Sequence, residues 1–358
     1  MTDPIRIDNI SAFFELSQYE YRVFDMSRTV RPLANDTFKQ IENQQALYPT
    51  PFQQYAWLGI IFWHPETIDE PAIWFLKFPI DEMGFLKLEA RDSFIQEMLE
   101  QVGEKIKAEA DDKTPEAASK AETKHESQFA FKPSQDKMAI FNALATRELG
   151  SSPSKFYQHA HEYLSGKLGY DQWSFLGFQG LADVVANLDK DDNEKNAASA
   201  ISQMPEQPLM LFSQLLEHAQ PGAALTQALL KRLVEELAEP APTVPLLTAL
   251  ARGLSNSDER DNCTRLLLDS SLGTDIEILA LIASRSWQSL QDNSLLMKFL
   301  EALAQQPQQS FDVILMELLP IPDMRNSILE GMRNPQRSEA LSRRIGGFMR
   351  RFQDAQEH

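Results

Sequence analysis

The chain has 358 residues, of which 43% are hydrophobic and 24% are charged. At about 150 residues per domain this length predicts two domains, and the apolar fraction excludes a chain that is disordered throughout. The formal net charge of −18 makes most of the surface repel nucleic-acid phosphates, and a single cysteine, Cys263, excludes a disulfide framework or a zinc site built from cysteines.

The sequence contains no candidate membrane span. No stretch approaches the roughly 18 uninterrupted apolar residues that cross a bilayer. The first residues, MTDPIRIDNI, lack the apolar core of a signal peptide. We therefore expect no transmembrane segment and a cytoplasmic location.

Residues 1–102 predict a small α+β domain, because helix and strand patterns alternate along them. Apolar residues recur at helical spacing over residues 8–18 and again over 89–102. Residues 21–26 are typical of a short strand, and residues 85–88 are a weaker strand candidate.

An antiparallel hairpin is the strongest strand prediction. The runs YAWLGIIFW (55–63) and AIWFLKFPI (72–80) are rich in aromatic and β-branched residues and are separated by a loop with prolines at its flanks. Both faces of the hairpin are apolar, so it is either sandwiched inside the protein or carries an exposed patch. The patch would make its tryptophans partner-binding residues: Trp57, Trp63 and Trp74.

Residues 103–136 change character abruptly. Between Glu104 and Glu126 there are five lysines and seven acidic residues among alanines, with few apolar side chains large enough to bury. This composition predicts a charged, flexible linker or a frayed charged helix. The alternative is a recognition segment around Phe129-Ala130-Phe131.

Helical patterns fill residues 137–352, and strand patterns are absent there. Successive pairs of predicted helices advance by roughly 35 residues, which favours an all-α, HEAT-like α-solenoid over an irregular helical bundle. Most predicted boundaries carry Pro, Gly, Asp, Asn or Ser. The predicted helices are 137–149, 154–165, 171–188, 193–204, 207–219, 222–238, 243–254, 257–270, 274–286, 293–305, 309–319, 322–332 and 336–352.

The catalytic and metal-binding motifs that we tested are incomplete. His159 and His161 are two residues apart and point to different sides of a helix, so they cannot share a metal ion. The acidic stretch 189–200 lacks the glycine and the final glutamate of a calcium loop. Cys263 lies in an amphipathic stretch with no adjacent histidine. We predict no catalytic residue, no metal ligand and no cofactor-binding residue.

Two glycines lie inside the predicted helix 171–188. Gly177 and Gly180 are three residues apart and therefore share a face, and glycine disfavours helix formation. We expect another helix or the hairpin to approach the backbone closely there, with a ligand as the alternative.

The C-terminal segment reverses the charge of the chain. Residues 325–351 hold seven arginines against two glutamates, a net charge of +5. The last predicted helix is amphipathic, with a predicted apolar stripe of Leu341, Ile345 and Met349. Its cationic side either closes the end of the helical domain or binds an acidic protein, RNA or an anionic membrane surface. The candidate partner-binding arginines are Arg337, Arg343, Arg344, Arg350 and Arg351.

Several long strings carry a resemblance to a known family: FELSQYEYRVFDMSR, QQYAWLGIIFW, IWFLKFPIDEMGFLKLEARDSF and WSFLGFQGLADVVANL, together with the arginine-rich end. With these strings the chain resembles a proteobacterial family of full-length proteins catalogued as a domain of unknown function. The resemblance implies a bacterial cytoplasmic protein with no assigned activity, so no site residue can be carried over.

These observations favour a non-catalytic protein-interaction or scaffold module with an unidentified protein partner. One alternative is an enzyme or small-ligand binder whose site lies between the two domains. A second alternative is an RNA-associated adaptor that uses the arginine-rich C-terminal helix, although the overall negative charge disfavours nucleic acid.

Overall fold

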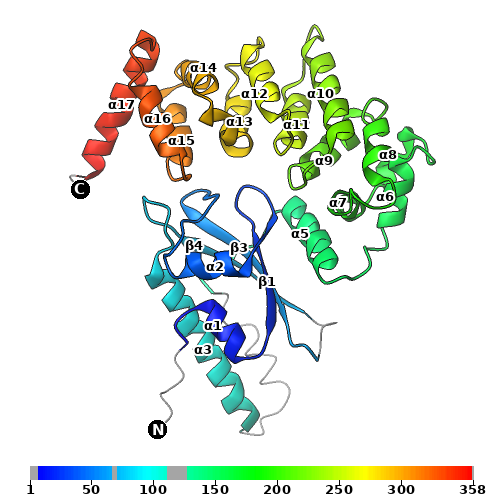
Figure 1. Cartoon of the computed structure of the whole chain (residues 1–358), viewed down its shortest axis with the longest axis vertical. Coiled ribbons are helices and arrows are strands. Elements are labelled where there is room, and N and C mark those ends of the chain that lie inside the picture. Colours follow the sequence, from blue (N-terminus) through cyan, green and yellow to red (C-terminus); the bar gives the residue numbers. More distant parts are fainter. Residues whose placement is uncertain (1–6, 67–70, 111–126, 357–358) are drawn as a thin grey trace. The chain divides into compact units, whose positions relative to one another are not determined.

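The structure is a computed structural model that describes residues 7–66, 71–110 and 127–356. It divides into two compact units, Met1–Pro133 (unit 1) and Ser134–His358 (unit 2). The chain is mostly helical, with one small antiparallel sheet near the N-terminus, in agreement with the predicted order of mixed and all-helical regions (Figure 1). Within the described ranges, no helix is both long enough and apolar enough to cross a lipid bilayer.

The sheet of unit 1 has four strands in the order β2-β1-β3-β4, and every pair is antiparallel. The predicted hairpin is confirmed: β3 pairs with β4 in a register that places Ala56 opposite Phe78 and Phe62 opposite Ala72. Residues 85–88 do not form a strand, because only a single bridge joins Leu86 to Ile80. The strands are β1 (Glu20–Asp25), β2 (Arg31–Leu33), β3 (Tyr55–Trp63) and β4 (Ala72–Pro79).

Unit 1 contains three described helices, α1 (Ile10–Leu16), α2 (Asn35–Glu42) and α3 (Leu88–Ala110). Asn9 caps α1, since its side chain accepts a hydrogen bond of 2.7 Å from the backbone N–H of Ala12. Helix α2 was not predicted, because it has eight residues and no side-chain cap that would mark its start.

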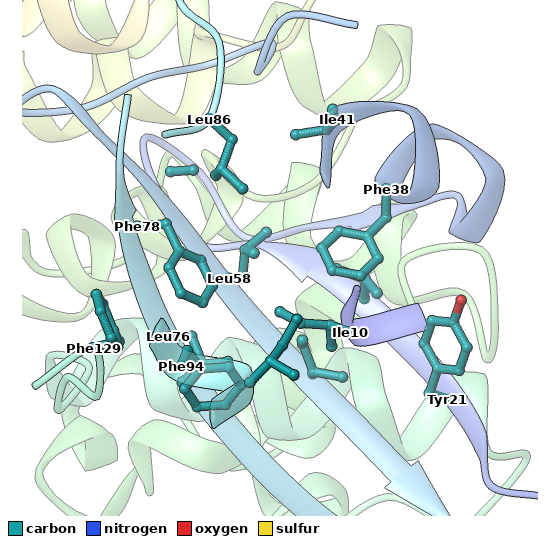
Figure 2. Close-up of a cluster of buried hydrophobic side chains, with 14 of the residues drawn as sticks. Ile10, Tyr21, Phe38, Ile41, Leu58, Leu76, Phe78, Leu86, Phe94 and Phe129 are labelled. Atoms are coloured by element: carbon teal, nitrogen blue, oxygen red, sulfur yellow. The ribbon is translucent and has the colours of Figure 1, made fainter. Parts of the chain in front are cut away.

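The three helices cover one face of the sheet and form the core of unit 1. Because side chains alternate along a strand, the even-numbered residues of β3 share this face, and they pack with apolar residues of all three helices. Figure 2 shows Phe38 and Ile41 of α2 and Phe94 of α3 around the strand side chains. The core-facing residues of β3 are Ala56, Leu58, Ile60 and Phe62.

The predicted linker 103–136 differs from the structure at both ends. Helix α3 continues to Ala110, and residues 127–131 pair with the edge of β4. The backbone N–H of Lys77 donates to the carbonyl of Phe129 at 2.8 Å, and that of Phe131 donates to Phe75 at 3.0 Å. Phe129 is buried in the core of unit 1, so it packs inside the protein and is not an exposed recognition residue. Residues 111–126, the middle of the predicted linker, lie outside the described residues.

Every helical range predicted for residues 137–352 contains a helix in unit 2, but the range 171–188 holds two. A short 3-10 helix ends at Phe175 and α7 begins at Phe178. The helices are α5 (Gln135–Glu148), α6 (Tyr157–Leu164), η1 (Tyr170–Phe175), α7 (Phe178–Ala186), α8 (Asn193–Ala200), α9 (Glu206–Leu216), α10 (Ala223–Leu237), α11 (Val244–Leu254), α12 (Arg260–Asp269), α13 (Ile276–Arg285), η2 (Trp287–Gln291), α14 (Asn293–Leu303), α15 (Gln308–Leu318), α16 (Met324–Met332) and α17 (Glu339–Gln356).

Helices that are two apart in the chain are neighbours in unit 2. One series runs from α5 through α7, α9, α11, α13 and α15 to α17, each packing on the next (Figure 1). Helices α6, α8 and α10 form a second series, and α12, α14 and α16 form a third. Some sequence neighbours also pack on each other, such as α6 with α7, α10 with α11 and α13 with α14.

Candidate functional site

Helix α17 is anchored on α14 and α15 by one face (Figure 1). Leu341 and Phe348 are buried and lie seven residues apart on that face. A Cβ added at Gly347 would lie 2.4 Å from Oε1 of Gln308, so a side chain at this position would have to displace the Gln308 side chain of α15. The predicted apolar stripe is therefore wrong at Met349, which is 42% exposed, because the helix is rotated to bury Phe348 instead.

Three of the five candidate arginines of this region bond within unit 2. Arg337 donates to the carbonyl of Met332 at 2.9 Å, and Arg344 donates to that of Ala304 at 3.2 Å. These carbonyls end α16 and α14, where the helix dipole favours a cation. Arg351 pairs with the largely buried Asp312 at 2.6 Å. These contacts support the interpretation that this part of the arginine cluster closes the end of the helical domain.

The other two candidate arginines face away from α14 and α15. The side chain of Arg343 is 73% exposed and lies 3.5 Å from Glu339, an exposed pair of the kind that contributes little stability. Arg350 is also exposed. Gly346 lies between them on the same stripe, and within the described part of the chain no atom comes within 4 Å of the position of its Cβ. We call Arg343, Gly346 and Arg350 the outer α17 face.

The hairpin tryptophans are largely engaged in packing. Trp63 is only 5% exposed, and Trp74 lies among the rings of Phe14, Phe62 and Phe94, with centroids 4.6–5.6 Å away. Trp57 is half-buried, and its indole N–H donates to the carbonyl of Phe52 at 2.9 Å. The three residues therefore offer much less surface than an exposed hairpin would.

The two glycines near α7 are explained by packing, as predicted. Gly177 is the N-cap of α7, and Gly180 lies in its first turn. A Cβ on Gly180 would lie 2.4 Å from the carbonyl oxygen of Phe156, the residue that precedes α6. The close approach of α6 and α7 therefore requires glycine at this position.

A pocket of about 400 Å³ within unit 2 was not predicted from the sequence. Its polar lining includes Arg147, Asp189, Glu194 and His218, on segments that are far apart in the chain. Arg147 donates to both carboxylate oxygens of Asp189, at 2.6 and 3.0 Å, and this bonding lowers the pKa of Asp189. The guanidinium and this carboxylate thus neutralise each other, which leaves little driving force for acid-base chemistry.

A buried ionic cluster centres on Glu217, the residue that precedes His218 of the pocket lining. The carboxylate of Glu217, at the end of α9, accepts hydrogen bonds from Arg252 of α11 at 2.6 Å and from Arg285 of α13 at 2.9 Å. Arg252 also lies 3.8 Å from Asp136 of α5. The cluster joins four helices of one series, and no local sequence spacing signals it.

Burial and charge act in opposite directions on this cluster. Burial by itself would raise the pKa of Glu217, but the Arg285 and Arg252 guanidinium groups outweigh it and lower the pKa to about 2. Burial lowers the pKa of the neighbouring His218 to about 4, although the negative charge of Glu217 by itself would raise it. At neutral pH, Glu217 is therefore ionised and His218 is neutral, an arrangement that suits a structural cross-link.

A second buried carboxylate, Asp25, organises the loops after β1 in unit 1. It accepts hydrogen bonds from the backbone and side chain of Ser27 at 2.8 and 2.5 Å, from Tyr48 at 2.6 Å, and from Thr50. Burial and the negative charge of Asp25 raise the pKa of Tyr48 well above its ordinary value. Asp25 is thus saturated by donors of its own unit and acts as a loop anchor.

Comparisons with known proteins assign no activity to any of these residues. No curated protein and no solved structure matches the chain. Among the residues that the structure describes, no three His, Cys, Asp or Glu side chains are grouped in a way that could hold a metal ion.

One family model matches residues 5–349, which includes parts of both units. This match confirms the resemblance, seen in the sequence, to a domain of unknown function that spans nearly the full chain. The chain therefore belongs to the family described as "Protein of unknown function (DUF3549)".

Proposed function

We propose that this protein is a non-catalytic protein-interaction module of the cytoplasm, which binds an acidic partner protein through the outer α17 face. The observation that carries the proposal is the division of the arginines. Arg337, Arg344 and Arg351 bond to other elements of unit 2, although Arg351 is 59% exposed, whereas the exposed Arg343 pairs with Glu339 of its own helix and Arg350 is exposed as well. Arginines that do not hold the fold together are available to a partner.

The arrangement of unit 2 supports a HEAT-like helical repeat. The first residues of α9, α11, α13 and α15 are 38, 32 and 32 residues apart, a spacing typical of paired-helix repeats. Such repeats are commonly binding scaffolds, because each repeat contacts mainly its neighbours and leaves an extended surface. In this proposal an α+β domain and a repeat domain are joined through the charged residues 111–126.

Charge favours an acidic protein over RNA. The chain carries −18 in total, so nucleic-acid phosphates are repelled over most of its surface. An acidic protein can contact the outer α17 face with a few local carboxylates. RNA would bring a long phosphate backbone close to the acidic remainder of the chain. RNA binding would instead call for a broader basic surface with exposed aromatic side chains.

The hairpin tryptophans rank below the outer α17 face as a binding surface. Trp63 and Trp74 are held by packing, and Trp57 uses its only hydrogen-bond donor internally. A partner would have to displace these contacts before it could use them.

The test is a pull-down with the tagged full chain from a lysate of the source organism, in which captured protein and RNA are both quantified. The variant is Arg343→Glu combined with Arg350→Glu. The matched control is Lys195→Glu combined with Lys231→Glu, which changes the net charge equally at exposed positions of α8 and α10.

We expect the wild-type chain and the lysine control to retain a stoichiometric acidic protein and the arginine variant to lose it at least tenfold. Equal retention by all three chains would contradict the proposed site. Recovery of RNA in place of protein, lost with the arginine variant, would favour the RNA-associated alternative.

A further inference from the structure

Gly346 stands apart from the other glycines in the α-helices of unit 2. Gly180, Gly253, Gly331 and Gly347 each have an atom of another element within 3.3 Å of the position of an added Cβ. The nearest atom is a backbone carbonyl oxygen at Gly180 and Gly253 and a side-chain atom at Gly331 and Gly347. At Gly346, no atom of the residues that the structure describes lies within 4 Å of that position, and the residue is exposed.

This glycine weakens the helix without serving the described fold. Gly346 lies inside the 18-residue helix α17, where glycine is a poorer helix former than almost any other residue. Because the other glycines mark close helix contacts, the remaining one points to a contact made with a molecule outside the described chain.

The charges around Gly346 identify the kind of molecule. Arg343 and Arg350 lie seven residues apart, so about 10.5 Å of helix axis separates them on one stripe with Gly346 between them. Met349 flanks this stripe and is 42% exposed. The surface therefore presents two cations, a gap without a side chain and an apolar edge. Glu339 lies 3.5 Å from Arg343 and is itself exposed, so an acidic partner would replace this weak pair.

We propose that an acidic helix of a partner protein packs along the outer α17 face and crosses α17 at Gly346. Two carboxylates of the partner, seven residues apart on its own helix, pair with Arg343 and Arg350. This inference rests on the proposed function and specifies the form of the partner.

Helix packing explains why all three residues are needed. Absence of a side chain at position 346 lets the second backbone come closer than usual, as the backbone of Phe156 approaches Gly180. The ion pairs of Arg343 and Arg350 can both form only if the axes of α17 and of the partner helix stay nearly aligned over about 10.5 Å. Such an alignment corresponds to helix packing with a crossing angle of about 20°. A flexible acidic chain or an RNA phosphate chain would use the arginines but would not need the glycine.

The test measures binding of fluorescein-labelled, alanine-rich helical peptides to the full-length protein by fluorescence anisotropy. The first peptide carries two glutamates seven residues apart. The second has the same composition, but its glutamates are two residues apart and therefore point to different sides of the helix. We expect the first peptide to bind at least tenfold more tightly than the second.

Substitutions then test each part of the surface. Gly346→Gln fills the gap with a good helix former in open space, so the protein should stay folded by circular dichroism while its affinity for the first peptide falls at least tenfold. Ala280→Gln, which adds the same side chain at an exposed position of α13, should leave the affinity unchanged. Arg343→Glu should lose binding and regain it with a peptide in which one glutamate is replaced by lysine.

Three results would each overturn the acidic-helix inference. They are equal affinities for the two peptides, no saturable binding of either peptide, and an unchanged affinity of Gly346→Gln for the first peptide. The pull-down separates this failure from that of the proposed function. If Gly346→Gln still captures the partner while the double arginine variant does not, the proposed function stands and the helical contact at Gly346 is wrong. If both variants capture it, both proposals fall.

Discussion

At the scale of single residues, buried charges act as cross-links in unit 2. Glu217 is fully buried and bonds to two arginines that lie 35 and 68 residues further along the chain. A buried carboxylate is tolerated only with such partners, since removing it from water is costly. The same bonds that orient α9, α11 and α13 therefore keep Glu217 ionised.

This environment predicts a loss of stability in acid. The pKa of Glu217 is about 2 in the folded chain against an ordinary 4.5, so stability present above pH 4.5 is lost as the pH falls toward 2. The pKa of His218 is about 4 in the folded chain against an ordinary 6.5. As the pH falls, His218 is therefore protonated in the unfolded chain before it is protonated in the folded chain, and stability also falls between pH 6.5 and 4.

Urea unfolding of the full chain at a series of pH values, with hydrogen exchange to follow unit 2, checks this expectation. Glu217 by itself should account for about 3 kcal/mol between pH 4.5 and 2. Glu217→Gln should be less stable at neutral pH and should lack this part of the pH dependence. An identical pH dependence in wild type and Glu217→Gln would contradict the assignment.

At the scale of helices, close packing decides where glycine is needed. Gly180 faces the backbone carbonyl of Phe156, which cannot move aside as a side chain can. Gly346 lies further inside its helix, and no atom of the described residues lies within 4 Å of the position of its Cβ. The two positions therefore compare a packed glycine with one in open space.

Gly180→Ala should destabilise the protein by about 1–3 kcal/mol, the range for an overpacked site, although alanine favours helix. Gly346→Ala should be neutral or stabilise by up to about 1 kcal/mol, because only the gain in helix propensity remains. Thermal unfolding of the two variants and the wild type measures both effects. A stable Gly180→Ala protein would mean that α6 and α7 can move apart at little cost.

At the scale of the whole molecule, segments distant in sequence complete each unit. Phe129 follows α3 by many residues, yet it packs in the core of unit 1 against Phe78 and Phe94, with ring centroids 5.4 and 6.3 Å away. A sequence boundary at residue 102 would divide this core. The compact unit ends only at Pro133.

Phe129→Ala should therefore destabilise unit 1 by about 3 kcal/mol, as expected for removal of a buried phenyl ring. Phe175→Ala is the control, since that ring is 73% exposed and should contribute less than about 0.5 kcal/mol. Hydrogen exchange in urea, read from peptides of β3 and β4, distinguishes the two. Unchanged protection in Phe129→Ala would show that residues 127–131 are dispensable for the sheet.

By itself the sequence determined the order and type of most elements, because those depend on local periodicity. Aromatic and β-branched residues over 55–63 and 72–80, with a proline-flanked loop between them, predicted the hairpin. Helical spacing with proline and glycine boundaries predicted the helices of unit 2. Helix α2 escaped prediction because its start lacks a capping side chain. The extent of the linker was overestimated, because pairing of residues 127–131 with β4 is a long-range contact.

Only the tertiary structure decided which side chains are available for function. In the sequence, Arg337, Arg344 and Arg351 already share a stripe at heptad spacing, but only the structure shows that these three reach carbonyls or a carboxylate on neighbouring elements, whereas Arg343 and Arg350 do not. The Arg147–Asp189 pair and the Glu217 cluster likewise join residues 35 to 68 positions apart. Local pattern specifies how a segment folds, whereas the orientation of each face depends on which distant helix it packs against.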